Sequence, residues 1–340
     1  MAICSGKHTP DIYNGDDSVS IYFGDERELT CGTELFSQFG ASLFSLVLVF
    51  KENETWMMAG QDINQWSDNT FLISQNIGCP APLTLKTINL AQDPGNGVNR
   101  ALAIWQGANG VYISDGRAPI PIHNDIREYF DRKDSRCIKS SEIRNSTAFI
   151  DPINHEYHWI FSSGTAGTKK ELVYSIIYNG WYEVDRGTGK SIRCGCVVQD
   201  TYGNPYNYAA ISGGYIERLE NGTDFDGNSI VHEFQTGDFL LNGSICYETM
   251  LDRLKLITVG KSTTSNSIAV THYGDGCTTG TTLKTFSPAK SGYRIAEPYT
   301  TDKLGGYTFH SLKFSMSTND ETIGFEPLAI GTTYHIMRED

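Results

Sequence analysis

Residues 146–185 read STAFIDPINHEYHWIFSSGTAGTKKELVYSIIYNGWYEVD. Within this stretch, turn-forming residues separate four short runs that are rich in β-branched and aromatic side chains. The runs are Thr147–Ile150, Tyr157–Phe161, Leu172–Ile177 and Trp181–Val184. Strands have this composition, and short links make consecutive strands antiparallel neighbours. The stretch therefore predicts one complete four-stranded meander.

The links between these runs have the composition of turns. In Asp151-Pro-Ile-Asn154 the proline fixes φ, and the asparagine can adopt a positive φ. Ser162–Lys170 is a polar loop, and Asn179-Gly180 predicts a two-residue hairpin. Strands in up-and-down order with short links form the blades of β-propellers. We therefore expect this meander to be a propeller blade.

The second half of this pattern recurs in the N-terminal two thirds of the chain. An apolar run, an Asn/Gly turn, an aromatic residue and a glycine also occur in residues 43–60, 101–116 and 208–222. A single meander exposes an apolar face that only a neighbouring blade can cover. We therefore predict a domain of propeller-like blades over residues 1–223, in a propeller that need not be complete. Independent hairpins of an ordinary β-domain are the alternative.

One segment has the periodicity of a helix. In residues 123–131, Ile126, Tyr129 and Phe130 follow one another at i, i+3 and i+4, and Asn124 or Asp125 is suited to the N-cap. The pattern predicts a short helix near 124–131 on the outside of the strands.

The sequence changes character at Asp224, where longer alternating patterns begin. Leu312, Phe314 and Met316 alternate with polar residues, and Tyr334 and Ile336 follow the same rule. Such alternation predicts strands with one buried face. We expect residues 224–340 to form a second domain that resembles a β-sandwich. The predicted fold class is all-β: antiparallel four-stranded meanders forming a complete or incomplete β-propeller, plus this C-terminal region.

Charge and hydropathy limit the partners of the chain. The 340 residues carry a formal net charge of −13, so the averaged surface repels phosphate. This disfavours DNA wrapping but suits either ordinary solubility or an acidic channel through which DNA slides. The longest apolar run, Leu43–Phe50, is too short to cross a bilayer, and the first residues lack a secretory pattern. We expect synthesis in the cytoplasm and no membrane insertion.

The residues that commonly bind metals do not form a recognisable set. The eight cysteines predict free thiols without disulfides. Cys194-Gly-Cys196 lacks a second pair at zinc-like spacing, and His155 and His158 should point to opposite faces of a strand. Asp224–Asn228 resembles the start of a calcium loop, but Gln235 stands where the bidentate glutamate belongs. We therefore predict no metal site and no cofactor.

Familiar catalytic motifs are also missing from the sequence. It contains neither a Gly-x-Ser-x-Gly elbow nor a His-Glu-x-x-His helix. Asp185–Lys190 is a basic, glycine-rich turn without the strand-to-helix context of a phosphate-binding loop, and a hairpin tip is the simpler interpretation. A pair of catalytic carboxylates of the glycosidase type stays possible, because the distance between two carboxyl groups cannot be judged from sequence. No catalytic residue is predicted, and we expect a protein that is not an enzyme.

Three segments resemble a known family: the run Ala148–Val184, the segment Ile104–Gly116 leading to Ile122, and the closing region Thr308–Ile336. They are similar to propeller-bearing nozzle or hub proteins of the tails of short-tailed bacteriophages. The resemblance implies a structural protein, made in the host cytoplasm and located in the virion tail. Its partners would be further copies in a ring, commonly a hexamer, and other tail proteins. DNA would pass through the ring without sequence-specific binding, so that the protein acts in tail assembly and genome ejection.

Two other functions remain compatible with the sequence. The first is a carbohydrate-binding or glycan-cleaving propeller, such as a receptor-binding tail component, because exposed aromatic residues often bind sugars. Sialidase propellers carry a Ser-x-Asp-x-Gly-x-Thr-Trp turn, of which Ser114-Asp115-Gly116 preserves only a fragment. The second is a cytosolic scaffold propeller unrelated to viruses.

Overall fold

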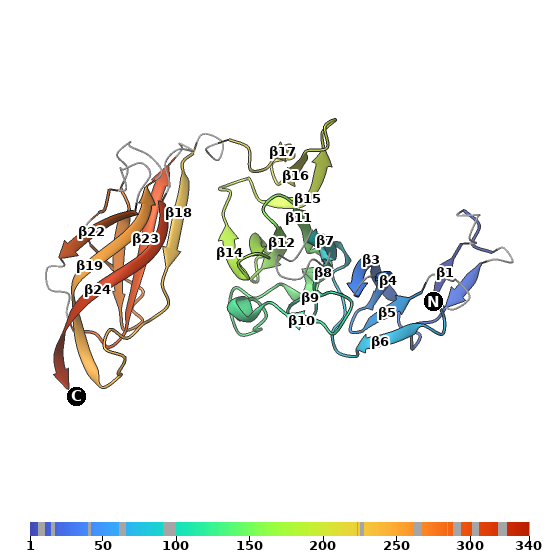
Figure 1. Cartoon of the computed structure of the whole chain (residues 1–340), viewed down its shortest axis with the longest axis horizontal. Coiled ribbons are helices and arrows are strands. Elements are labelled where there is room, and N and C mark those ends of the chain that lie inside the picture. Colours follow the sequence, from blue (N-terminus) through green and yellow to red (C-terminus); the bar gives the residue numbers. More distant parts are fainter. Residues whose placement is uncertain are drawn as a thin grey trace. The chain divides into compact units, whose positions relative to one another are not determined.

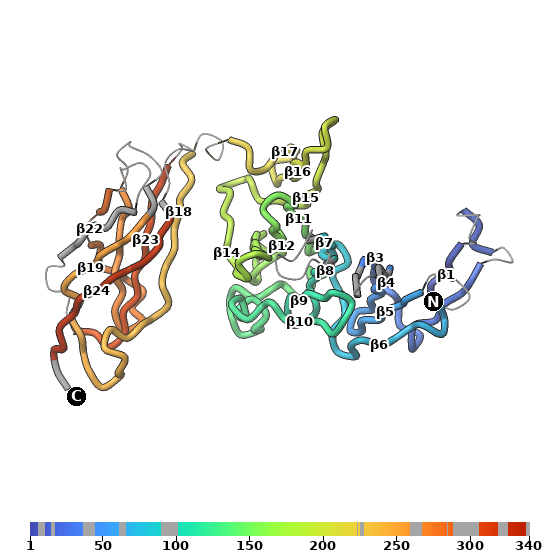
Figure 2. Tube along the Cα trace, viewed as in Figure 1, coloured from blue at the N-terminus to red at the C-terminus, as the bar shows by residue number. Residues whose placement is uncertain are grey.

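A computed structural model describes residues 1–5, 11–14, 18–39, 42–60, 66–90, 100–222, 224, 228–260, 267–283, 285–287, 294–300, 306–318 and 325–339, whose course is traced in Figure 2. The chain forms two compact units, Met1–Glu220 and Asn221–Asp340. The all-β fold class is confirmed, since every strand pairing in both units is antiparallel among the described residues (Figure 1).

The N-terminal unit is a succession of antiparallel sheets in sequence order. β1 pairs with β2, β3–β6 and β7–β10 are two meanders joined by the pairing of Ser37 with Arg100, β11–β14 is a third meander, and β15–β17 is a three-stranded one. The strands are β1 (Ala2–Cys4), β2 (Val19–Ile21), β3 (Leu29–Phe39), β4 (Ser42–Lys51), β5 (Thr55–Ala59), β6 (Thr70–Ser74), β7 (Lys86–Leu90), β8 (Arg100–Gln106), β9 (Val111–Ser114), β10 (Ile120–Pro121), β11 (Thr147–Asp151), β12 (Glu156–Ser163), β13 (Thr168–Ser175), β14 (Gly180–Val184), β15 (Ile192–Gln199), β16 (Pro205–Ile211) and β17 (Ile216–Arg218).

The four meanders stack as propeller blades do. Their first strands are neighbours in order, because β7 contacts both β3 and β11, and β11 also contacts β15. A separate apolar cluster fills each space between successive sheets. Phe50 and Trp105 meet between the first and second sheets, with ring centroids 4.9 Å apart, and Phe149 packs with Ile192 between the third and fourth. Each sheet thus covers the apolar face of the next, as the sequence predicted.

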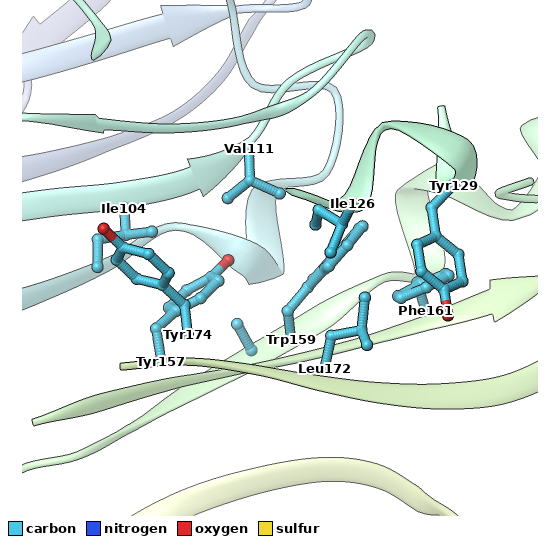
Figure 3. Packing of buried hydrophobic residues seen from close by; sticks show 10 residues of the cluster. Ile104, Val111, Ile126, Tyr129, Tyr157, Trp159, Phe161, Leu172 and Tyr174 are labelled. Carbon is cyan, nitrogen blue, oxygen red and sulfur yellow. The ribbon is translucent and has the colours of Figure 1, made fainter. Parts of the chain in front are cut away.

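The largest cluster lies between the second and third sheets. Tyr157, Trp159 and Phe161 point from β12 toward Ile104 and Val111 of the second sheet (Figure 3). Alternate residues of β12 therefore share one face, as the period of two requires. Hydrogen bonds also cross this boundary: the Tyr157 hydroxyl donates to the carbonyl of Thr84, just before β7, at 2.9 Å, and Trp159 Nε1 donates to Gln106 Oε1 at 2.9 Å. The sheets are thereby fixed in one register.

The predicted meander is confirmed, with two corrections in its turns. Asp151 pairs with Glu156, and Ser175 pairs with Gly180, so both turns contain four residues. The link at Asn179 is therefore longer than the predicted two-residue hairpin, although Asn179 does adopt a positive φ of 51°. In the first turn His155, and not Asn154, takes the positive φ of 56°.

The predicted helix at 124–131 is shorter and tighter than expected. The structure has a 3-10 helix, η3 (Asn124–Tyr129), with non-helical dihedral angles at Ile126 and no side-chain cap. Ile126 and Tyr129 are buried against the third sheet (Figure 3), so tertiary packing sets the local geometry. Two further 3-10 helices, η2 (Pro82–Thr84) and η4 (Ser140–Asn145), were not predicted.

The C-terminal unit is a sandwich of two sheets, as the sequence predicted. One sheet has the order β18-β23-β20-β21 and the other β22-β19-β24. Leu254 and Leu256 on β19 pack against Val270, Leu312 and Phe314 of the facing sheet. The strands are β18 (Ile230–Gln235), β19 (Tyr247–Gly260), β20 (Ala269–Gly274), β21 (Thr281–Thr282), β22 (Arg294–Thr300), β23 (His310–Thr318) and β24 (Phe325–Glu339).

The expected burial on the last strand is wrong. Tyr334 is 37% and Ile336 55% exposed, although their alternation with polar residues predicted a buried face. The alternation is real, but Tyr334 and Ile336 are not among the residues packed into the core around Leu312 and Phe314, whereas Ile330 of the same strand is. Residues 225–227 of the calcium-like Asp224–Asn228 lie outside the described residues. Among the helices described, none has the length and hydropathy needed to cross a membrane.

Candidate functional site

The two faces of the third sheet differ, because one is apolar and the other carries charged side chains beside a small apolar cluster. The apolar face carries Tyr157 and Trp159 into the core described above. Cross-strand register places Asp151 beside Glu156, and His158 beside Phe149, on the opposite face. Because Phe149 belongs to the cluster shared with β15–β17, the charged face lies at the boundary between the third and fourth sheets. We call Asp151, Glu156, His158, Glu171 and Arg186 the charged cluster.

Half of the charged cluster is a chain of charge-assisted hydrogen bonds. Arg186 follows β14 and binds Glu171 with both arms of its guanidinium, at 2.7 Å from Nε and 2.9 Å from Nη2. Glu171 Oε1 is also 2.9 Å from His158 Nδ1. The side chains of Arg186, Glu171 and His158 are only 8%, 6% and 3% exposed. Buried charges at such a density persist only when they are paired, as these are.

The titration of Glu171 and Arg186 follows from this pairing. Burial alone would raise the pKa of Glu171, but hydrogen bonds from Arg186 and His158 outweigh it and leave the pKa below its usual value. Burial would lower the pKa of Arg186, yet Glu171 and Glu220 raise it overall. Glu171 is therefore a carboxylate, and because a carboxylate only accepts, Nδ1 of His158 must be the donor between them.

The other half of the cluster is a pair of carboxyl groups that flank the turn between β11 and β12. Asp151 Oδ1 accepts hydrogen bonds from the backbone N–H groups of Ile153 and Asn154, and its Oδ2 accepts one from the Asn154 side chain at 2.9 Å. Tyr182 donates a hydrogen bond to Glu156. Burial raises the pKa of Glu156, and burial together with Glu156 raises that of Tyr182.

The two halves meet at the second nitrogen of His158. One donor atom each from Asp151, Glu156 and His158 lie within 4.8 Å of one another. Nε2 of His158 is 4.0 Å from Glu156 Oε2, which is too long for a hydrogen bond. It is buried, and none of the residues that the structure describes forms a hydrogen bond with it. Carboxylate and imidazole groups in this arrangement can hold a proton or a divalent cation.

A small cavity lies next to the charged cluster. Its volume is about 170 Å³, and Lys170, Glu171, Glu183 and Arg186 are among its lining residues. Glu183 forms an ion pair with Lys170 as Glu171 does with Arg186, so both carboxylates face a cation. A second, more open hollow on the first two sheets is lined mainly by polar side chains: Arg27, Asn53, Glu54, Leu72, Gln75, Asn76 and Asn109. Neither hollow is lined by an aromatic residue.

No family model matches the sequence. No curated protein matches it either. Among solved structures, the chain is similar to an exo-β-1,3-galactanase from Phanerochaete chrysosporium, with 10% identity, a TM-score of 0.29 and coverage of 89% of this chain and 81% of that one. It is also similar to a glycoside hydrolase family 43 arabinoxylan arabinofuranohydrolase from Bacillus subtilis, with 9% identity, a TM-score of 0.26 and coverage of 91% and 79%. Similarity this low assigns the chain to no family.

The residues that the sequence analysis considered as possible ligands or phosphate-binding groups do not form a binding site together. His155 lies in a turn with Nδ1 3.0 Å from the Pro152 carbonyl oxygen, apart from the cluster that contains His158. Cys194 and Cys196 are exposed free thiols on β15. Asp185–Lys190 is not a hairpin tip but the link from β14 to the fourth sheet, and its Arg186 and Lys190 bind Glu171 and Glu217.

The charged cluster itself was missed by the sequence analysis. Glu156 and His158 are two apart on one strand, so the period of two already places them on one face. What the sequence could not give is the four-residue length of the turn, which sets Asp151 opposite Glu156. The approach of Arg186 from the next connection is also a tertiary feature.

Proposed function

We propose that the chain is a structural protein of a bacteriophage tail that assembles with further copies of itself into a ring around the DNA exit channel. In this role it acts in tail assembly and genome delivery and is not an enzyme. The observation that carries the proposal is the exposed apolar edge strand β24.

β24 has the properties of an assembly edge. Among the described strands it pairs with β19 alone, along almost its whole length, so its other backbone edge is open to a further strand. Leu328, Tyr334, Ile336 and Met337 are 42%, 37%, 55% and 52% exposed. Long open edges of this kind are templates for pairing with another chain, and monomeric proteins usually protect them. We therefore place an interface on β24.

A second copy of the chain is the partner that this edge fits best. A closed ring requires that one surface of each copy meets a different surface of the next copy. An open strand edge meets this requirement by adding to a sheet of its neighbour through backbone hydrogen bonds. The formal net charge of −13 per copy gives a ring that repels phosphate, so DNA can slide through its channel.

A glycan-cleaving propeller is the second candidate, because the 170 Å³ cavity contains Glu171 and Glu183. The geometry supports it less well. A general acid needs a raised pKa, whereas the pKa of Glu171 is lowered by its pairing with Arg186. Sugar sites also commonly offer aromatic platforms, and this cavity has none. Release of reducing sugar from a panel of polysaccharides, abolished by Glu171→Gln or Glu183→Gln, would favour this candidate over the proposal.

Light scattering and negative-stain electron microscopy of the purified full-length chain test the ring. We expect a ring with an open centre, and antibodies against the chain should label the tail tip of the virions that contain it. The double variant Tyr334→Lys/Ile336→Lys introduces charge on the edge of β24 and should leave a folded monomer.

Ile177→Lys is the matched control, because Ile177 is an equally exposed apolar residue, at 60%, in the turn before β14. This variant should assemble like the unchanged chain. A protein that stays monomeric at all concentrations, alone and with virion tail proteins, would overturn the proposal. So would assembly that survives both lysines on β24.

A further inference from the structure

The β11–β12 hairpin brings three metal-binding groups together on one face of the third sheet. Glu156 and His158 are two residues apart on β12, and Asp151 is the cross-strand partner of Glu156. Asp151 and His158 are each 2% exposed, and the Glu156 side chain is 18% exposed. The strand register therefore holds two carboxylates and one imidazole together in a largely dry environment, where their mutual repulsion is strong.

His158 presents an unpaired nitrogen to the two carboxylates. Its Nδ1 donates to Glu171, and Nε2 has no hydrogen-bond partner within the described structure. A buried polar atom without a partner costs free energy, and natural proteins rarely leave one without a reason. Phe149 stacks on the imidazole at a centroid distance of 4.3 Å, and the hydrogen bond of Nδ1 to Glu171 opposes a flip of the ring that would move Nε2 away from the carboxylates.

The surrounding hydrogen bonds are those that orient metal ligands. A histidine ligand commonly donates its other N–H to a carboxylate, which fixes the tautomer and directs the free nitrogen to the metal. Glu171 is the carboxylate that accepts the Nδ1–H of His158, and Arg186 holds Glu171 in place through two hydrogen bonds. Asn154 orients Oδ2 of Asp151, and Tyr182 orients Glu156. Each of the three donors thus has its own positioning group.

The charges of the cluster are unbalanced. Asp151, Glu156 and Glu171 are acidic, and Glu220 is 3.1 Å from Arg186. Arg186 pairs with Glu171 and Glu220, and among the described residues no lysine or arginine forms an ion pair with Asp151 or Glu156. A divalent cation at the three donors would remove the excess negative charge and provide a partner for His158 Nε2.

We propose that Asp151, Glu156 and His158 bind a divalent transition-metal ion, such as Zn²⁺ or Mn²⁺, that staples the β11–β12 hairpin beside the fourth sheet. One imidazole and two carboxylates suit these ions, whereas Ca²⁺ and Mg²⁺ prefer oxygen ligands alone. Donors at about 2.1 Å from a tetrahedral ion are about 3.4 Å apart, so the 4.0 Å between His158 and Glu156 must contract by about 0.6 Å. Because the three donor atoms lie within 4.8 Å of one another, no pair of them needs to approach by more than about 1.4 Å when the ion binds.

The site is structural in this proposal and independent of ring assembly. The test uses the full chain with Cys194→Ser and Cys196→Ser, because those exposed thiols could themselves bind zinc. Elemental analysis and calorimetric titration of the chelator-treated protein measure binding of Zn²⁺ and Mn²⁺, with Ca²⁺ and Mg²⁺ for comparison. We expect one equivalent of Zn²⁺ or Mn²⁺ and a higher melting temperature of the protein when the ion is bound.

Glu156→Gln removes a metal ligand but preserves the shape of the side chain and its bond from Tyr182. We expect it to weaken the affinity by at least about tenfold. Glu183→Gln is the matched control, because Glu183 is a carboxylate of the same sheet that binds Lys170 instead. The Glu183→Gln variant should bind Zn²⁺ or Mn²⁺ with the same affinity as the parent protein.

Failure to bind either ion, or equal binding by Glu156→Gln, would overturn the proposal. If Glu156→Gln does not fold, ¹⁵N nuclear magnetic resonance of the parent decides the question. Zn²⁺ should then shift the Nε2 resonance of His158 far more than that of Nδ1. An unchanged Nε2 resonance in saturating Zn²⁺ would show that a proton, and not a metal ion, occupies the cluster.

Discussion

His272 and His310 form a hydrogen-bonded pair of imidazoles in the core of the C-terminal sandwich, with Nε2 of His272 2.9 Å from Nδ1 of His310. Both side chains are buried, and Nε2 of His310 is a further 2.8 Å from the Thr249 hydroxyl. Burial, followed by the positive charge that His310 can carry, lowers the pKa of His272 to about 4. Burial also lowers the pKa of His310, although Asp275 acts in the opposite direction on both rings.

This pair should make the stability of the C-terminal unit depend on pH. Below about pH 6.5 the unfolded chain protonates its histidines while the folded pair stays neutral, so the unfolded state binds more protons. The free energy of unfolding should therefore fall between about pH 6.5 and 4, by up to about 3 kcal/mol for His272. Urea denaturation at a series of pH values measures this slope.

His272→Gln separates the pair from the carboxylates that also titrate in acid. The variant should be less stable at pH 7, but its stability should fall less steeply between pH 6.5 and 4. His232→Gln, at an exposed position on β18, should leave the slope unchanged. An identical slope in His272→Gln and the parent would show that the buried pair is not responsible.

The ion pair of Arg186 and Glu171 should be costly to break from one side. Arg186→Met leaves Glu171 buried without its main partner, which typically destabilises a protein by about 3–5 kcal/mol. The double variant Arg186→Met/Glu171→Gln should recover much of this loss, because no buried charge is then left unpaired. Chemical denaturation of the single and double variants gives the coupling energy.

An exposed pair on the same sheet is the comparison for this experiment. Lys170→Met breaks the ion pair with Glu183, whose side chains are 35% and 40% exposed. It should cost less than about 1 kcal/mol, because water and salt screen such pairs. Equal losses from Lys170→Met and Arg186→Met would contradict the view that burial makes the difference.

The strands of the third sheet were predictable because local rules agree with one another there. Alternation, turn composition and aromatic content all indicate four strands between Thr147 and Val184, and the pairings of Asp151 and Ser175 confirm them. The turns were less predictable, because residues with a positive φ, such as His155 and Asn179, occur in turns of several lengths. A difference of two residues in a turn changes which side chains become neighbours across the strands.

The tertiary features were the ones that sequence patterns could not give. The recurring hairpins at 43–60, 101–116 and 208–222 are second and third strands of their sheets, whereas the hairpin ending at Val184 joins the third and fourth. They therefore do not occupy equivalent places in the blades. The charged cluster depends on Arg186, which comes from the connection after β14, and Ile336 is exposed although its alternation with polar residues is that of a strand with one buried face.

Gly195 should tolerate no side chain, because β15 runs close to the ring that covers His158. A Cβ atom on Gly195 would be 2.4 Å from Cδ1 of Phe149, and Phe149 stacks on His158 behind it. Gly195→Ala should therefore destabilise the N-terminal unit by about 1–3 kcal/mol. Gly213→Ala is the control, since its nearest contact would be 3.5 Å and its φ is not positive. Equal melting temperatures for the two variants would contradict this account.

The Tyr157 hydroxyl should contribute to the joint between the second and third sheets. It is fully buried and donates to the carbonyl oxygen of Thr84 at 2.9 Å, in a helix that precedes β7. Tyr157→Phe keeps the ring but deprives that carbonyl of its donor, which should cost about 1–2 kcal/mol. Tyr178 is 85% exposed, so Tyr178→Phe should leave the free energy of unfolding almost unchanged. Amide hydrogen exchange in residues 82–90 should rise in Tyr157→Phe alone, because the bond holds η2 against β12. Unchanged exchange there would show that packing by itself fixes the two sheets.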